Sequence, residues 1–293
     1  MPPQQQSDCL DFFSRVSLVA ARRFSDPLWA SYSDPMTSVW DSLGVLLEGY
    51  AFERQGRAAD FPAVAADVVE ELRLFPPDPS QVWQRFQAKL GSTSLNIKNN
   101  PLAPKGTALT GGSVTSKKSA VEIANEVVTP LVQWVLRGLN ANQTDEVHAK
   151  IREITGVDYK IASLFLRDVA MRYSAFPSTS RWLLQPVDTW VRRSAALLGA
   201  VGDDEAAAKF IVQTAQTENY EPEKINQGMW YFGSEIAGSE YRLTRALADL
   251  AKAEELLKRH LHSLAKATSC DSAIVAAVLW VMQKVDGLRR KPK

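Results

Sequence analysis

The sequence contains few cysteines and histidines, the usual ligands of a zinc ribbon or an iron–sulfur cluster. Its 293 residues include two cysteines, Cys9 and Cys270, which lie far apart, form no CxxC pair and are expected to be reduced. Three histidines are present, and His260 and His262 would point to different faces of a helix because they are two residues apart. These patterns argue against a zinc ribbon and against a cluster, so we expect no metal and no other cofactor.

Long hydrophobic runs and a strong net charge are also absent. No apolar run approaches membrane-spanning length, and the first residues, MPPQQQSDCLDFF, lack the features of a secretory signal. We therefore expect a cytoplasmic protein with no membrane partner. Because the net charge is only +1, any phosphate-binding surface has to be local. Basic clusters that could form one, or could be ordinary solvated surface, are Lys117-Lys118, Arg192-Arg193 and the C-terminal LRRKPK.

Helical periodicity, by contrast, is abundant. Apolar residues recur at three- and four-residue spacing along most of the chain, and alternating strand-like patterns are scarce. The composition, 45% apolar and 23% charged, is ordinary for a globular protein, and we expect an all-α fold. The predicted helices are 36–54, 62–75, 80–90, 119–139, 144–154, 160–173, 187–201, 204–218, 222–237, 240–265 and 270–287, with helix entries at Asp60, Asp78 and Thr144.

Two segments interrupt this periodicity. Residues 91–118 are rich in Gly, Ser, Thr, Asn and Pro, which predicts a long loop, functional or disordered, or a pair of short strands. Residues 174–186 are a second irregular connection. We accordingly expect N-terminal helices and the long loop in 1–118, a helical core in 119–240, and C-terminal helices in 241–293 that complete one two-lobed unit.

Residues 154–162, ITGVDYKIA, join a short amphipathic helix to a long apolar one through a glycine-containing turn. Lysine is rarely buried unless it is paired or functional, so Lys160 at the head of the apolar run requires an explanation. The backbone N–H groups of such a hairpin can hold a DNA phosphate without reading base sequence, although an ordinary αα-hairpin is also common. The candidate DNA-binding residues of this hairpin are Gly156, Val157, Asp158 and Tyr159.

A second motif, QPVDTWVRR, places Asp188 directly before an apolar helix. Aspartate is a favourable N-cap, which is the simplest role here, but an N-cap carboxylate can also be reactive. Together with INQGMWYFG at 225–233, these motifs resemble those of the helix-hairpin-helix DNA glycosylase superfamily, which includes 8-oxoguanine glycosylases and endonuclease III-like enzymes. The resemblance covers about residues 119–240, with a helix-hairpin-helix catalytic core.

The resemblance implies a two-lobed all-α glycosylase fold with an inserted long loop and, as partner, double-stranded DNA that contains a damaged or modified base. We expect a monomer. In the family a hairpin like PGVGxK is followed by VDxxVxR, and the lysine is the nucleophile of bifunctional members while the aspartate is the catalytic carboxylate. Lys160 and Asp188 stand at these positions. We expect burial and the helix N-terminus to favour the neutral, nucleophilic form of Lys160.

This sequence departs from the family pattern in three places. Thr155 stands where proline is usual, and Asp158 stands where the second glycine is usual, which puts a negative charge beside the expected phosphate. The spacing from Lys160 to Asp188 is also longer than in many relatives, and the extra residues fall in 174–186. They could reshape the rim of a base pocket.

Further candidate residues have structural alternatives. Aromatic side chains near the motifs could stack on a flipped base, but most aromatic residues pack in cores. Two asparagines could enter the duplex as a wedge or form a turn before Pro101, and of two arginines one could contact phosphate while the other faces solvent. The base-pocket candidates are Trp190, Gln227, Trp230 and Tyr231, the wedge candidates are Asn99 and Asn100, and the arginines are Arg192 and Arg193.

The expected function is that of a DNA glycosylase that flips out and excises a base. The substrate would be an oxidised purine such as 8-oxoguanine, or a bulky hypermodified cytosine of phage DNA in antiviral defence. The reaction would either use water alone or include AP lyase activity through a Schiff base on Lys160. The alternatives are a non-catalytic helix-hairpin-helix DNA-binding module and a helical interaction protein with no DNA role.

Overall fold

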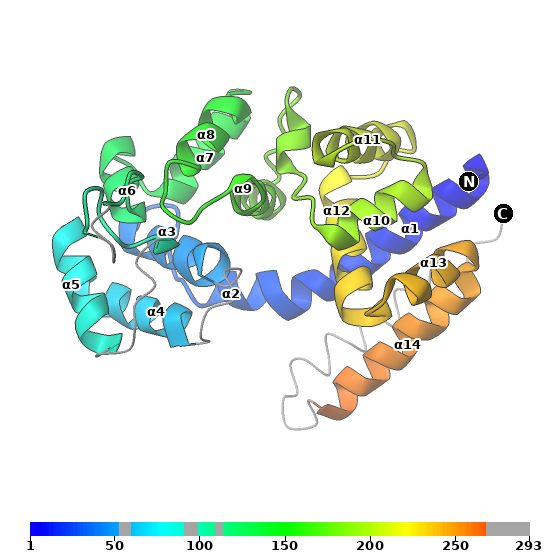
Figure 1. Ribbon diagram of the computed structural model, residues 1–293, viewed down its shortest axis with the longest axis horizontal. Coiled ribbons are helices and arrows are strands. Elements are labelled where there is room, and N and C mark those ends of the chain that lie inside the picture. Colours follow the sequence, from blue (N-terminus) through cyan, green and yellow to red (C-terminus); the bar gives the residue numbers. More distant parts are fainter. Residues whose placement is uncertain (53–59, 91–98, 109–113, 268–293) are drawn as a thin grey trace. The chain divides into compact units, whose positions relative to one another are not determined.

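The described part of the chain is helical and contains no β-strand (Figure 1), which confirms the predicted all-α class. Two isolated β-bridges join Ala108 to Val114 and Lys118 to Ile154. In the described ranges no helix is both long and apolar enough to cross a membrane. The predicted helix 270–287 lies outside these ranges. The residues that the computed structural model describes are 1–52, 60–90, 99–108 and 114–267.

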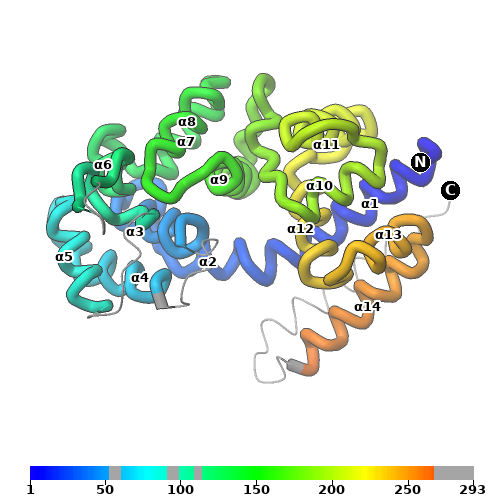
Figure 2. Tube along the Cα trace, viewed as in Figure 1, coloured from blue at the N-terminus to red at the C-terminus, as the bar shows by residue number. Residues whose placement is uncertain are grey.

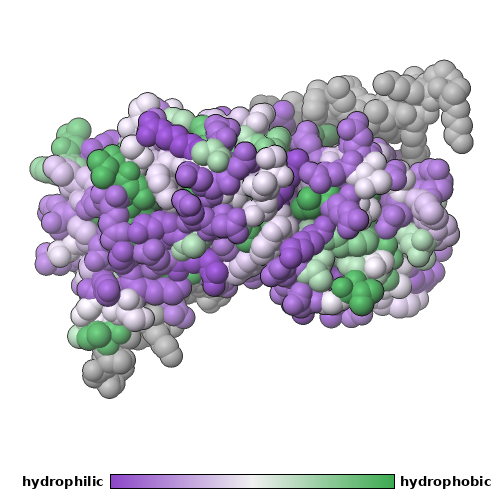
Figure 3. Space-filling model, turned by 90° about the horizontal axis from the view of Figure 1, so that it is seen from above, coloured by the Kyte–Doolittle hydropathy of each residue, from purple (hydrophilic) through white to green (hydrophobic). Residues whose placement is uncertain are grey.

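The chain divides into two compact units. We call Leu28–Pro186 the middle unit, and Met1–Pro27 together with Val187–Lys293 the terminal unit. Helix α2 (Asp26–Ala30) contains the boundary between them. On the molecular face drawn in Figure 3, hydrophilic residues cover most of the surface, and apolar residues gather in separate groups.

The middle unit has a long helix, α9 (Tyr159–Tyr173), in its core. Every residue from Ile161 to Ala170 is buried, and each fully buried Leu, Ile or Phe side chain contributes about 1.5–3 kcal/mol. Charges within this core are paired, since Asp168 accepts hydrogen bonds from Tyr50 and Arg167. The other helices of the unit are α3 (Val39–Leu46), α4 (Asp60–Leu72), α5 (Pro79–Leu90), α6 (Ala120–Val127), α7 (Leu131–Asn140) and α8 (Thr144–Ile151), with a 3-10 turn at Arg181–Leu184.

The terminal unit is organised by two helices far apart in sequence, α1 (Pro3–Ala20) and α12 (Pro222–Tyr231), which lie side by side (Figure 2). Their backbones approach closely at Gly228, where a Cβ atom would come within 2.0 Å of the Phe13 carbonyl oxygen. Phe12 and Phe232 pack edge to face at 5.0 Å beside this contact. The other helices of the unit are α10 (Thr189–Leu198), α11 (Asp204–Thr217), α13 (Glu240–Ala248) and α14 (Leu250–Ala267).

Several predicted helix boundaries are wrong for identifiable reasons. The helix expected at 119–139 is two helices, because Val128 adopts a left-handed conformation at the end of α6 and Pro130 is the N-cap of α7. The helix expected at 240–265 is divided at Asp249, which is extended. Thr144 is not an N-cap: it is the first residue of α8, and its buried hydroxyl has no hydrogen-bond partner. Asp78 does accept a hydrogen bond from the Gln81 amide, as its predicted helix entry requires.

Candidate functional site

The predicted hairpin between two helices is present. Helix α8 ends at Ile151, and α9 begins at Tyr159. The turn is closed by a hydrogen bond from the Val157 amide to the Ile154 carbonyl, at 3.1 Å. Gly156 has a φ of +79°, a left-handed conformation that costs a residue with a Cβ about 1–2 kcal/mol. The tight turn therefore depends on glycine at this position.

Asp158, the residue that departs from the family pattern, is the N-cap of α9. Its Oδ1 accepts a hydrogen bond from the Ile161 amide at 2.9 Å. The positive N-terminus of the helix stabilises the carboxylate, so part of the negative charge is compensated locally. The backbone amides of Asp158 and Lys160 donate to no acceptor among the described residues. These two donors are available to an anion.

Lys160 lies in the first turn of α9 and is half-buried. The enclosed part of the helix begins one residue later, with Ile161 at 3% exposure. No described residue forms a hydrogen bond or an ion pair with the Lys160 ammonium. The structure thus places Lys160 at the edge of the core, next to the hairpin, rather than inside the apolar run.

Aromatic rings pack around Tyr159, the first residue after the hairpin turn. The Tyr159 ring lies 4.7 Å from the His148 ring and stacks on Trp182 at 6.2 Å. Burial lowers the pKa of His148 to about 4, so this histidine is neutral near pH 7. Its Nε2 lies 3.2 Å from both the Tyr159 carbonyl oxygen and the Ser163 hydroxyl. These contacts hold α8 against α9.

The lysines around the hairpin differ in how their charge is compensated. Lys118 and Lys150 both pair with Glu126 and Glu153 at 2.6–3.3 Å. Lys117 instead donates hydrogen bonds to backbone carbonyl oxygens of the hairpin region. The sequence drew attention to the Lys117-Lys118 pair only as a basic cluster, since the fold, not the spacing, brings it to the hairpin.

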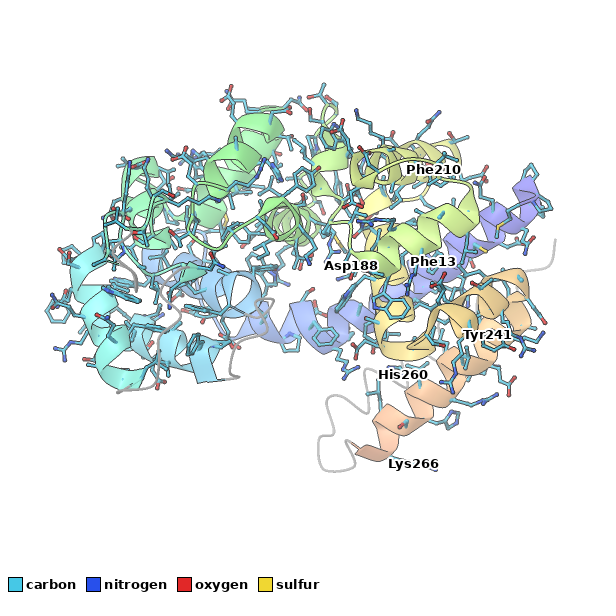
Figure 4. The ribbon with its side chains drawn as sticks, in the orientation of Figure 1. Phe13, Asp188, Phe210, Tyr241, His260 and Lys266 are labelled. Carbon is cyan, nitrogen blue, oxygen red and sulfur yellow. The ribbon has the colours of Figure 1, made fainter. Side chains whose placement is uncertain are left out.

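Asp188 is the N-cap of α10, as its position before the helix predicts (Figure 4). Its Oδ1 accepts hydrogen bonds from the amides of Trp190 and Val191, both at 2.9 Å. The side chain is half-buried, and its Oδ2 has no hydrogen-bond partner in the described part of the chain. One oxygen therefore holds the helix while the other can face a ligand.

Both arginines that follow Asp188 are paired with carboxylates of the terminal unit. Arg192 lies 2.6 Å from Asp204, and Arg193 lies 3.0 Å from Glu240. The Arg193 guanidinium also lies over the Trp190 ring, 5.5 Å from its centre. A phosphate would have to compete with these carboxylates for either arginine.

The aromatic candidates for a base pocket take part in the packing of the terminal unit. Tyr231 is fully buried, and its hydroxyl lies within hydrogen-bond distance of Arg23 and His260. Trp230 packs edge to face on Phe24, with ring centres 5.5 Å apart. Trp190 packs against Gly233, where an added Cβ would come within 2.8 Å of the tryptophan Cβ. Packing inside the unit accounts for these contacts, and none of them requires a bound base.

Gln227 is the polar member of the same group and is 2% exposed. Its Nε2 lies 3.4 Å from the Ser25 hydroxyl, while its Oε1 has no hydrogen-bond partner. The two wedge candidates differ from each other. Asn100 is fully buried and its Oδ1 accepts from the Leu102 amide, as a turn residue would, whereas Asn99 is exposed.

The predicted site residues are distributed over both units. Lys160 and its hairpin belong to the middle unit, and Asp188 with the base-pocket candidates belongs to the terminal unit. Within the described ranges, no group of three or more His, Cys, Asp or Glu side chains could hold a metal ion. Comparisons of the chain with protein-family models, with curated proteins and with solved structures found no match.

Proposed function

We propose that this protein is a DNA glycosylase of the helix-hairpin-helix type, which removes a flipped-out base from double-stranded DNA. The observation that carries the proposal is the hairpin: a left-handed Gly156, two amides without acceptors at Asp158 and Lys160, and a lysine side chain without a partner beside them. The capping carboxylate of Asp188, with one oxygen unengaged, adds the second reactive group.

DNA binding would begin at a backbone phosphate. The unengaged hairpin amides and the positive N-terminus of α9 together favour an anion, and neither distinguishes one base sequence from another. Binding of this kind suits an enzyme that has to scan duplex DNA for one altered base. Its affinity falls as salt rises, because binding releases counterions from the DNA and this release is less favourable at higher salt.

Asp188 would stabilise the developing charge at the sugar. Excision requires the base to leave the stack, at a cost of a few kcal/mol, and the sugar then gains oxocarbenium character as the glycosidic bond stretches. A carboxylate already fixed by two backbone amides stabilises that positive charge without reorganising. In a monofunctional enzyme the same carboxylate would orient or deprotonate the attacking water.

Lys160 would supply the lyase step of a bifunctional enzyme. The neutral amine forms a bond to C1′ while the base departs with the glycosidic electron pair and takes up a proton. Opening of the sugar ring then gives an imine, and loss of a proton from C2′ expels the 3′ phosphate by β-elimination. Lys160 is half-buried and forms no ion pair with a described residue, which is compatible with this role.

A trapping experiment with labelled duplexes tests the proposal. The panel would carry 8-oxoguanine, uracil, 5-hydroxymethylcytosine, its glucosylated form and an abasic site. We expect alkali-sensitive sites on one of the base-containing duplexes, and, for a bifunctional enzyme, a borohydride-trapped adduct that Lys160→Gln abolishes. An adduct that persists in Lys160→Gln would show that another amine is the nucleophile.

The duplex from which a base is excised identifies the substrate class. Excision of 8-oxoguanine would make the protein a repair enzyme, whereas excision of the glucosylated cytosine would make it a defence enzyme against modified phage DNA. The irregular connection 174–186 contains Trp182, which stacks on the Tyr159 ring of the hairpin. Extra residues beside the hairpin are the reason for including the larger base, the glucosylated cytosine, in the panel. Intact glucosylated DNA in the assay would argue strongly against that second class.

A non-catalytic DNA-binding module is the second candidate. One observation favours it: the two hydrogen bonds from α10 account for Asp188 as a structural N-cap. Such a module binds duplex DNA with a salt-dependent affinity and releases no base from it. Product analysis therefore separates the two candidates.

A further inference from the structure

Lys117 reaches the hairpin from outside the helix-hairpin-helix motif. Its ammonium donates to the Arg152 carbonyl oxygen at 2.8 Å and to the Val157 carbonyl oxygen at 3.2 Å. Arg152 is the C-cap of α8, and Val157 lies in the turn before α9. One side chain thus connects the two ends of the hairpin.

The backbone next to Lys117 fixes this placement. The Lys118 amide donates to the Glu153 carbonyl oxygen at 3.1 Å, and the Thr155 amide donates to the Lys118 carbonyl oxygen at 2.7 Å. These bonds form the isolated bridge between Lys118 and Ile154. The segment before α6 therefore runs along the hairpin, and Lys117 is held beside the turn by backbone geometry.

The positive charge of Lys117 has no carboxylate partner within the described ranges. Lys118, the next residue, and Lys150 of α8 each pair with Glu126 and Glu153. Lys117 has Arg152 and Asp158 as charged neighbours, and burial together with Arg152 lowers its pKa. An ammonium has three N–H donors, and the two carbonyl oxygens engage two of them.

We infer that Lys117 is a DNA-binding residue whose third N–H donates to the backbone phosphate held by the hairpin amides. This inference rests on the proposed function and adds a residue to it. The ammonium would lie between two hairpin carbonyl oxygens and the phosphate, and would donate hydrogen bonds to all three. It would also offset the charge of Asp158, which the family pattern does not contain and which would otherwise repel that phosphate.

The test is a salt titration of binding to an undamaged duplex, with three variants. Lys117→Gln keeps a hydrogen-bond donor and removes the charge, Lys117→Arg keeps the charge, and Lys150→Gln removes a neighbouring charge that is already paired. We expect Lys117→Gln to bind roughly tenfold more weakly and to reduce the slope of log K against log salt by about one. Lys117→Arg and Lys150→Gln should keep the wild-type slope.

The other outcomes separate failure of the inference from failure of the proposed function. An unchanged slope in Lys117→Gln overturns it, and an unchanged slope with a lowered melting temperature means that Lys117 only braces the hairpin. Wild-type protein that binds no duplex overturns both this inference and the proposed function. Wild-type protein that binds with the expected slopes but releases no base overturns the glycosylase activity alone and leaves Lys117 as a DNA-binding residue.

Discussion

The two oxygens of Asp188 have different surroundings, and that difference allows one residue to be structural and reactive at once. Oδ1 is engaged by two amides of α10, whereas Oδ2 has no partner among the residues that the structure describes. The sequence predicted the N-cap from residue type and position alone. It could not indicate which oxygen would remain available, because that depends on where the chain turns before the helix.

Substitution of Asp188 separates the two roles. Asn caps helices about as well as Asp, so Asp188→Asn should change the free energy of unfolding little, whereas Asp188→Ala should lower it by about 1 kcal/mol. Loss of the charge should slow base excision by about 100-fold or more and leave duplex binding largely intact. Single-turnover excision, a duplex titration and urea unfolding measure the three quantities.

Asp203 provides the matched control. It is the N-cap of α11 and accepts from the Ala206 amide at 2.9 Å, but it belongs to no predicted motif. Asp203→Asn should leave both stability and excision unchanged. Equal loss of excision in Asp203→Asn and Asp188→Asn would mean that the effect is structural, and unchanged excision in Asp188→Asn would remove this carboxylate from the mechanism.

The hairpin between α8 and α9 is the element on which the proposed DNA binding depends. Its turn was recognisable in the sequence because a glycine-containing segment separates a short amphipathic helix from a strongly apolar run. The contacts that support the turn could not be recognised in the sequence, since His148, Trp182 and Lys117 all lie outside it. Local chemistry predicts a turn, whereas its supports are set by tertiary packing.

Gly156→Ala tests the link between turn geometry and DNA binding. The left-handed φ at this position should make the variant less stable by about 1–2 kcal/mol, and distortion of the turn should weaken duplex binding at every salt concentration. Gly106→Ala is the control, because Gly106 also has a positive φ, of +85°, but lies outside the hairpin. Equal duplex affinity in the two variants, measured where both are folded, would contradict a role for the turn.

His148 makes the junction of α8 and α9 sensitive to acid. Its pKa is about 4 in the folded protein because of burial, below the ordinary value near 6.5, so the unfolded chain binds the proton more readily. The stabilising effect of a neutral His148 is complete above about pH 6.5 and is lost as pH falls towards 4, by up to roughly 3 kcal/mol.

Urea unfolding between pH 7 and pH 4 measures this dependence. His148→Gln should flatten the curve over that range, even if the variant is less stable at pH 7. His262→Gln is the control, since His262 is exposed on α14 and should not alter the curve. A curve of unchanged steepness in His148→Gln would assign the acid sensitivity to other groups.

At the scale of the whole molecule, the sequence predicted the fold class better than the organisation of the chain. Periodicity is a local property, and it located most helices of the all-α fold. It gave no indication that α1 would pack beside α12, since Phe13 and Gly228 approach each other only in the folded chain. Helix α1 itself was not predicted, because its first turn, PQQQ, is polar and begins with proline.

The two proposed reactive groups show the same contrast between local pattern and chain organisation. Each was located from its own motif, but the division into units assigns Lys160 to the middle unit and Asp188 to the terminal unit. Release of a free base tests the proposed role of Asp188, and a borohydride-trapped adduct tests the proposed role of Lys160. Both the free base and the adduct can be measured directly.

The most direct measurement is detection of a free base by mass spectrometry. The full-length protein, in excess over DNA, would be incubated with the panel of modified duplexes and with glucosylated phage DNA, and the small-molecule fraction analysed. The account predicts release of one modified base, with an equal amount of abasic or cleaved DNA, and loss of that release in Asp188→Asn. Salt-dependent duplex binding without release of any base would contradict the glycosylase and leave a DNA-binding module.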